Sequence, residues 1–160
     1  MIANDLSAKI PRENFLLRKV AYIMKITLKK AIVEGKVAEG YFVCQNGDIW
    51  SNKRGSYNKM NTHIGGTTKY PKVNIRINGE TKVLYPHRIV CETFHSFPKP
   101  ESVTKEEWKN TPEAVKKIVG LAYQVNHIDH NKENHHPSNL EWVTVRQNQI
   151  KSQKHYGTSK

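Results

Sequence analysis

Residues 124–148 read QVNHIDHNKENHHPSNLEWVTVRQN, and their order of apolar and polar residues indicates two strands and a helix around a long loop. Ala122–Asn126 and Leu140–Thr144 have the composition of strands, and Val145–Lys154 follows as a helix. The loop between the strands is rich in Asn, His, Asp and Ser, and such loops are usually held by hydrogen bonds or a ligand. The stretch therefore predicts a strand–loop–strand–helix unit whose loop carries the chemistry.

A histidine beside an oxygen-bearing side chain at a strand end suits phosphodiester hydrolysis. That reaction needs a base for water, a cation for the phosphate charge and rigid placement of both. His127 supplies a base with an ordinary pKa near neutrality, and Asn126 supplies an amide oxygen. Neighbouring side chains of a strand point to opposite faces, so both can serve one site only where the strand ends. Asn148, about one turn into the expected helix, can close the ion site.

The same 25 residues resemble the HNH endonucleases of the phage and intron homing type. Their motif runs approximately V-[DN]-H-x-D-G-N-x-x-N-N-x-x-x-N-L-x-W-V-T, with a further Asn in the next helix. The preceding Pro86–Phe94, PHRIVCETF, resembles the H-R-[LI]-V segment before that motif. Tyr41–Tyr85 more weakly resembles the small β-rich module that often accompanies it. The resemblance implies a ββα-metal nuclease arrangement.

Residue by residue, the resemblance gives His127 the general-base position and Asn126 and Asn148 the two metal-ligand positions. It implies that Asn139 braces the loop. We expect Asn134 and Asp129 to brace it too, with Asp129 either orienting His127 or capping the loop. The expected cofactor is a divalent ion, Mg²⁺ first and Mn²⁺ as the alternative, because Mg²⁺ prefers oxygen ligands.

The loop histidines depart from the family pattern, which has Gly at the position of His130 and commonly Asn at that of His135. At the first position the glycine of the pattern suggests a positive φ, which a histidine adopts less readily. We interpret both, with His136, as surface or phosphate-facing histidines. A zinc site of His127, His130 and either His135 or His136 is the sharper alternative, although the usual thiols are absent. His87 either contacts phosphate or packs beneath the catalytic loop.

The charge of the chain indicates a polyanionic partner, although a plain solvated basic surface is the alternative. Lys and Arg number 26 against 14 Asp and Glu, a net charge of +12. We expect double-stranded DNA to be that partner, with the backbone contacted by basic residues along the whole chain. These are Arg18, Lys25, Lys29, Lys53, Arg54, Lys72, Arg76, Arg88 and Arg146.

The part before the motif predicts a basic helix and then short strands. Apolar residues recur at helical spacing from Pro11 to Gly35, although Tyr22–Leu28 is also locally β-rich. Lys72–Ile77 and Thr81–Tyr85 flank Asn78-Gly79, the strongest hairpin signal in the chain.

The sequence thus predicts an α+β protein with a small β-rich N-terminal region and a basic helix, followed by the C-terminal ββα-metal unit. Its expected parts are a basic helix at 1–40, a β-rich DNA-binding module with a linking helix at 41–97, a charge-balanced insertion at 98–121, the HNH unit at 122–154 and a disordered tail at 155–160. Other helices are expected from Pro86 to Phe97 and from Pro112 to Val119.

These features predict a metal-dependent DNA endonuclease, and the resemblance implies a free-standing phage or mobile-element nuclease of the homing type. A catalytically inactive DNA-binding module is the main alternative, because an Asn at position 126 is what a decayed site would show. A basic structural or ribosome-associated protein ranks last, since it has no need of the motif. The oligomeric state is open, and a monomer is favoured for nicking because one such centre cuts one strand.

The remaining features predict a cytoplasmic protein, in the host cytoplasm if a phage encodes it. Cys44 and Cys91 are too few and too far apart for a zinc knuckle or a disulfide framework, so we expect buried thiols. The N-terminus lacks the pattern of a secretion signal, and no window reaches about eighteen apolar residues.

Overall fold

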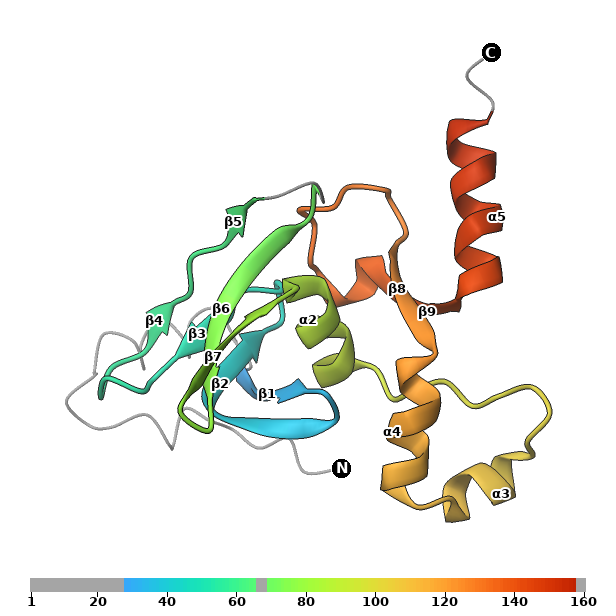
Figure 1. Ribbon diagram of the computed structural model, residues 1–160, viewed down its shortest axis with the longest axis horizontal. Coiled ribbons are helices and arrows are strands. Elements are labelled where there is room, and N and C mark those ends of the chain that lie inside the picture. Colours follow the sequence, from blue (N-terminus) through green and yellow to red (C-terminus); the bar gives the residue numbers. More distant parts are fainter. Residues whose placement is uncertain (1–27, 66–68, 158–160) are drawn as a thin grey trace.

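The computed structural model describes residues 28–65 and 69–157, which form an α+β fold of three antiparallel sheets and four helices (Figure 1). In chain order the elements are β1 (Leu28–Val33), β2 (Lys36–Cys44), β3 (Ile49–Ser51), β4 (Asn58–Lys59), β5 (His63–Ile64), β6 (Pro71–Ile77), β7 (Glu80–Leu84), α2 (Pro86–Phe94), α3 (Lys105–Asn110), α4 (Glu113–Leu121), β8 (Tyr123–His127), β9 (Leu140–Thr144) and α5 (Val145–Tyr156). A short 3₁₀ turn, Pro137–Asn139, precedes β9. The predicted α+β class is confirmed.

The first sheet has the strand order β1-β2-β3-β4. The helix that was predicted to continue to Gly35 is therefore wrong over its last residues. Residues 28–33 are instead a strand paired antiparallel with β2. Glu34 and Gly35 have φ of 51° and 69°, which suits a two-residue hairpin turn and not a helix end. The strand is favoured because the β-branched Ile32 and Val33 follow Ala31, and alternate side chains enter the core. The start of the predicted helix, with Arg18 and Lys25, lies outside the described residues.

The second sheet, in the order β5-β6-β7, contains the hairpin that the sequence predicted. Asn78 and Gly79 both have positive φ, 52° and 86°, and join β6 to β7. Val73 and Ile75 of β6 are fully buried, whereas Asn74 and Arg76, which alternate with them, are exposed. The alternation therefore sets which face of this hairpin meets the core.

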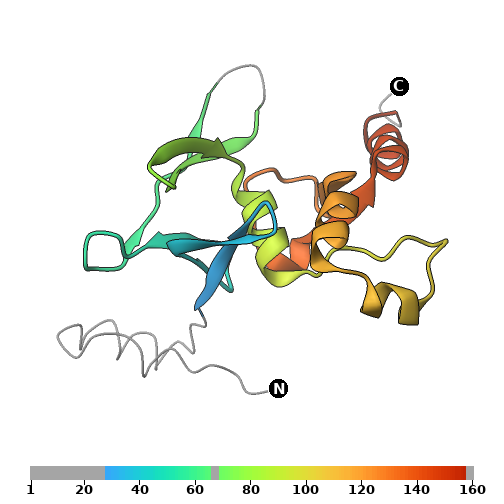
Figure 2. The same cartoon turned by 60° about the horizontal axis from the view of Figure 1, so that its bottom comes forward.

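Helix α2 is the centre of the molecule and lies between the β-rich part and the C-terminal unit in both views (Figures 1 and 2). It packs mainly on β1, and also contacts β2, β6, β8 and β9. Pro86 occupies its first turn, where a missing N–H costs nothing, and Ile89, Val90 and Cys91 are its buried face. The helix ends at Phe94, three residues before the predicted end at Phe97. A single hydrophobic core therefore includes residues of the β-rich module and of the C-terminal unit, which the sequence analysis treated as separate parts.

The C-terminal unit has the predicted order of strand, loop, strand and helix. β8 pairs antiparallel with β9 so that His127 lies opposite Leu140. Thr144 and Gln147 form a capping box in which each side chain bonds the backbone N–H of the other, so α5 starts directly after β9. The helix projects away from the rest of the fold (Figure 1).

Residues 98–121 hold two short helices, of which the sequence predicted one. α4 matches the predicted helix within two residues at its C-terminal end. α3 was not predicted, although Thr104 and Glu107 form a capping box, which is a sequence signal for the start of a helix.

Two further expectations concern the whole chain. Cys44 and Cys91 are buried free thiols, as predicted. In the part of the chain that the structure describes, we find no helix with the length and apolar character needed to cross a membrane.

Candidate active site

The three residues with predicted chemical roles lie around one cavity of about 160 Å³. Asn126 and His127 reach it from the end of β8, and Asn148 reaches it from the first turns of α5. The other lining residues are Tyr70, Val125, His130, Lys132 and Ser152. The strand end and the helix start therefore bring together what the sequence separates by more than twenty residues.

The amide of Asn126 is fixed by a residue that the sequence analysis did not identify. Its Nδ2 donates to Oε1 of Glu141 at 2.8 Å, and Lys151 of α5 forms an ion pair with the same carboxylate. A carboxylate only accepts hydrogen bonds, so it must face the nitrogen of the amide. The Oδ1 atom of Asn126 is therefore left for another partner.

The amide of Asn148 is fixed in the same manner. Its Nδ2 donates to Oε1 of Gln124 on β8 at 2.7 Å, which ties the first turn of α5 to the strand. Its Oδ1 atom is likewise left for another partner. The site thus offers two neutral amide oxygens, each held by a hydrogen bond from its own nitrogen.

His127 is buried, with 4% of its surface exposed, and its Nε2 atom has no hydrogen-bond partner. Burial is the main cause that lowers the pKa of this imidazole to about 4, with smaller contributions from the neighbouring His135 and Lys132 and an opposing effect of Asp129. The ring is therefore neutral at pH 7 and can accept a proton.

Asp129, Asn134 and Asn139 bond one another across the loop. Asp129 Oδ1 accepts from Asn139 Nδ2 at 2.8 Å, and its Oδ2 accepts from Asn134 Nδ2 at 2.7 Å. Asn139 closes the loop from the other side, because its Oδ1 accepts from the backbone N–H of Asp129 at 3.0 Å. These bonds lower the pKa of Asp129 and occupy both of its oxygens, so this side chain holds the loop and does not reach for His127.

His130 has a φ of 61°, in the left-handed region that the glycine of the motif suggested. Its ring stacks on His155 of α5 with centroids 3.7 Å apart and planes 14° apart. The contact joins the loop to the end of α5.

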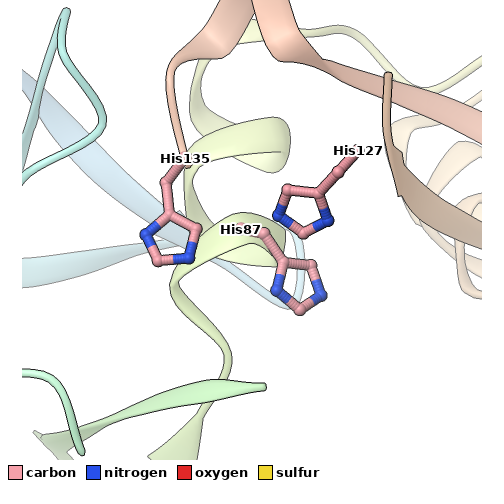
Figure 3. A group of neighbouring side chains, drawn as sticks. All are labelled: His87, His127 and His135. Carbon is pink, nitrogen blue, oxygen red and sulfur yellow. The ribbon is translucent and has the colours of Figure 1, made fainter. Parts of the chain in front are cut away.

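His87 packs against the loop between β8 and β9. Of the two roles expected for it, packing beneath the loop agrees with this position and phosphate contact does not. Its ring centroid is 5.1 Å from that of His127 and 6.4 Å from that of His135. Figure 3 shows the three rings grouped together, His87 from α2, His127 from the end of β8 and His135 from the loop. Of the zinc set considered from the sequence, His127, His130 and either His135 or His136, the fold groups His127 with His135, and His87 stands where His130 was expected. His87 was expected to pack beneath the loop or to contact phosphate, and it was not proposed as a metal ligand because it lies forty residues before His127 in the sequence.

A second hollow, of about 750 Å³, holds some of the predicted DNA-binding residues. Lys53, Arg54 and Arg76 line it, and Lys59, which the sequence analysis did not select, lines it too. Asn58, Asn61, Asn74, Ser51 and Ser56 add polar groups. We call this hollow the basic groove.

The other predicted DNA contacts are dispersed. Lys29 and Arg146 are exposed on β1 and α5, whereas Lys72 donates to the carbonyl of Gly65 at 2.8 Å. Arg88 is turned inward, because its Nε bonds Glu92 at 3.0 Å and its Nη1 bonds the carbonyl of Tyr123 at 3.3 Å. That guanidinium joins α2 to β8 and is not presented to a ligand.

Comparisons with known proteins find HNH endonucleases that are similar to this chain. A family model for HNH endonucleases matches residues 84–150, which include α2, β8, β9 and the start of α5. An uncharacterized HNH endonuclease of Acanthamoeba polyphaga mimivirus is 31% identical over 110 residues, 69% of this chain and 26% of that protein. A solved structure describing DNA binding and cleavage by the HNH homing endonuclease I-HmuI is similar with a TM-score of 0.51 and 21% identity, covering 76% of this chain and 56% of that chain.

Through residues 84–150 the chain belongs to the HNH endonuclease family. Its fold is similar to that of the I-HmuI structure over 76% of this chain. The chain spans about a quarter of the mimivirus protein and 56% of I-HmuI, so those proteins contain much that has no counterpart in the alignments.

Proposed function

We propose that this protein is a metal-dependent DNA endonuclease that hydrolyses phosphodiester bonds. The observation that carries the proposal is the meeting of His127, Asn126 and Asn148 at one cavity, with a neutral imidazole between two oriented amides. The family and the fold support a nuclease, since the I-HmuI structure concerns DNA binding and cleavage.

Asn126 and Asn148 suit a hard divalent cation, because each keeps its amide nitrogen engaged and leaves its oxygen free. We propose that these two oxygens hold Mg²⁺, with Mn²⁺ as a substitute. When bound, the ion neutralises charge on the phosphate during attack by water. No carboxylate belongs to this pair, so the substrate phosphate has to complete the site.

We assign the proton transfer to Nδ1 of His127. Nε2 of this ring is buried and faces protein, so Nδ1 is the nitrogen left to meet a water molecule. Nε2 then carries the ring proton, and Nδ1 accepts the proton of the attacking water. The hydrogen bonds of Asp129 and Asn139 keep the loop after His127 in place while this happens.

The basic groove is the proposed path of the DNA backbone. Lys53, Arg54 and Arg76 surround it, and the asparagines between them donate further hydrogen bonds to phosphate oxygens. Arg18, Lys25, Lys29 and Arg146 stay predictions as further contacts.

The test is cleavage of a supercoiled plasmid by the purified protein with Mg²⁺ or Mn²⁺. We expect nicked circles from the unmodified protein and none from His127→Ala, whose DNA affinity should change little because a buried neutral ring contributes little to phosphate binding. His136→Ala, at an exposed histidine of the same loop, is the matched control and should cut normally. Absence of nicking with either metal, together with intact DNA binding, would instead identify a DNA-binding module without activity.

We further propose that the protein is a free-standing nuclease of a phage or mobile element that acts as a monomer and nicks one strand. The likeness of its fold to a homing endonuclease supports this setting. Sequencing of the ends produced on the DNA that flanks its own gene tests both points. Staggered double-strand ends at the first time point would contradict the nicking monomer.

A further inference from the structure

His87, His127 and His135 each offer a ring nitrogen, and these nitrogens all lie within 4.8 Å of one another (Figure 3). The three residues come from α2, from the end of β8 and from the loop, so their approach depends on the whole fold. They are distinct from the amide pair of Asn126 and Asn148.

Two ring nitrogens of these histidines lack any hydrogen-bond partner although they are buried. They are Nδ1 of His87 and Nε2 of His127. A buried polar atom without a partner costs free energy, roughly 1–3 kcal/mol for a neutral group, and native folds seldom keep one without a reason. Two such atoms within the same group of rings point to a ligand that would satisfy both.

The state of the rings also suits a metal ion. Burial lowers the pKa of His87 to about 3 and, with smaller effects from neighbouring charges, the pKa of His127 to about 4, and burial lowers that of His135 as well. A metal binds the lone pair of a neutral imidazole, so no imidazolium has to be deprotonated at neutral pH, and a ring proton on the binding nitrogen moves to the other nitrogen.

We propose that His87, His127 and His135 bind a late first-row transition metal ion, of which Zn²⁺ is the type, at a site separate from the Mg²⁺ site. Imidazole nitrogens favour Zn²⁺, Co²⁺ and Ni²⁺, whereas Mg²⁺ favours oxygen, so the two sites select different ions. Three histidines leave a fourth position for water or a phosphate oxygen.

The rings have to move a little to close on the ion. With metal–nitrogen bonds of about 2.0–2.1 Å, tetrahedral ligand atoms lie about 3.4 Å apart, whereas the three nitrogens here lie within 4.8 Å of one another. His135 supplies the movement, because it is on the loop and its Nε2 is held only by the carbonyl of Lys132, at 3.0 Å. His87 and His127 are on a helix and a strand and form the fixed part of the site.

Occupation of the site has a consequence that rests on the proposed function. An ion on Nε2 of His127 displaces the ring proton to Nδ1, the nitrogen assigned to the attacking water. The base is thereby lost while the fold is intact. Zn²⁺ should therefore inhibit Mg²⁺-dependent cleavage.

The binding test uses the free protein and no DNA, so it does not depend on nuclease activity. We expect Co²⁺ to give the visible absorption of a four-coordinate site with three imidazole nitrogens. Zn²⁺ should displace the Co²⁺, and calorimetry should show one Zn²⁺ ion per chain at this site. His135→Asn should weaken this binding at least about tenfold, since even groups that only orient a ligand contribute that much. His136→Asn, in the same loop with its Nδ1 bonded to Ser138, should bind as the unmodified protein does.

His87→Gln is the second variant, and thermal unfolding with and without Zn²⁺ shows whether each variant is folded. A folded His135→Asn and a folded His87→Gln that both bind Co²⁺ as tightly as the unmodified protein would overturn the proposal. If the site binds Zn²⁺ but no variant of the chain cuts DNA, the metal site stands and the proposed nuclease fails. If the chain cuts DNA and Co²⁺ finds no such site, the nuclease stands and this inference fails.

Discussion

Asn126 and Glu141 lie directly opposite each other in the β8–β9 pairing, and the side-chain amide of the first donates to the carboxylate of the second at 2.8 Å. The bond turns the amide oxygen of Asn126 away from Glu141. We therefore regard Glu141 as a positioning residue, because it acts on the ion site only through Asn126. The same holds for Gln124, which fixes Asn148.

Glu141→Ala should lower the rate of plasmid nicking by about 10- to 100-fold and raise the Mg²⁺ concentration needed for half-maximal rate, as loss of an orienting partner does at other metal sites. Glu141→Gln retains an oxygen that can accept from Asn126 and should recover much of the loss. A metal titration of nicking separates this role from a structural one. Equal Mg²⁺ requirements in all three proteins would contradict it.

Asn126→Asp tests the charge of the ion site. A carboxylate strengthens Mg²⁺ binding, but here it would also lie opposite the carboxylate of Glu141, which loses the Nδ2 donor of Asn126, keeps its ion pair with Lys151 and repels the new charge. We expect the single variant to gain little, whereas Asn126→Asp with Glu141→Gln should lower the Mg²⁺ requirement for nicking. Tight Mg²⁺ binding to the unmodified free protein, measured by calorimetry, would show that an unassigned carboxylate is a ligand.

A substitution at Gly47 tests how the β-rich part supports the loop between β8 and β9. The φ of Gly47 is 87°, and a Cβ built there lies 2.2 Å from the backbone oxygen of His135. Gly55 has a similar φ of 82°, but a Cβ there meets nothing within 4 Å, so it is the matched control. Gly55→Ala should cost about 1–2 kcal/mol of unfolding free energy for the backbone alone. Gly47→Ala should cost more and also reduce nicking, as denaturant titration and plasmid assays would reveal. Equal effects of the two substitutions would mean that the contact with His135 is unimportant.

Neutralising Lys53 and Arg54 tests the basic groove. If each contacts one phosphate, the slope of log affinity against log salt should decrease by roughly 0.9 for each residue, and binding should weaken on every sequence alike. Lys105 and Lys109 of α3 are the charge-matched control and should leave the slope unchanged. Loss of affinity for one sequence only would show that the groove reads bases.

Cys91 should be unreactive in the folded protein. It is fully buried, and burial raises the pKa of its thiol to about 12, so the thiolate that attacks alkylating reagents is nearly absent at pH 8. The modification of Cys91, followed by mass spectrometry at pH 8, should begin only at denaturant concentrations that unfold the chain. Rapid labelling in native buffer would show that α2 opens locally.

The parts of the fold that the sequence predicted correctly depend on local signals. The Asn78-Gly79 turn and strand β9 are specified by a few adjacent residues, and both were found where predicted. The helix expected through residues 28–35 failed because its basic and apolar residues satisfy the helical period and the strand period alike. Only the partner strand β2 decides between them.

The residues of the candidate site also differ in whether a local sequence signal identifies them. Asn126, His127 and Asn148 were identified because they belong to one short motif, whereas His87 joins them only through the packing of α2. Glu141 could have been found from the sequence. In an antiparallel pair with His127 opposite Leu140, the residue before His127 lies opposite the residue after Leu140. This register places Asn126 opposite Glu141.

The central position of α2 bears on how such proteins can be recombined. The family match begins at residue 84, yet the apolar face of α2, with Ile89 and Val90, is buried chiefly by β1, which precedes the match. A fragment cut at residue 84 would leave that face in water and would tend to aggregate or to capture another apolar surface. Residues 84–150 therefore cannot be moved alone into another protein. Any chimera that moves them to a new DNA-binding part has to supply a strand with small and β-branched side chains like Ala31 and Val33 to receive the helix.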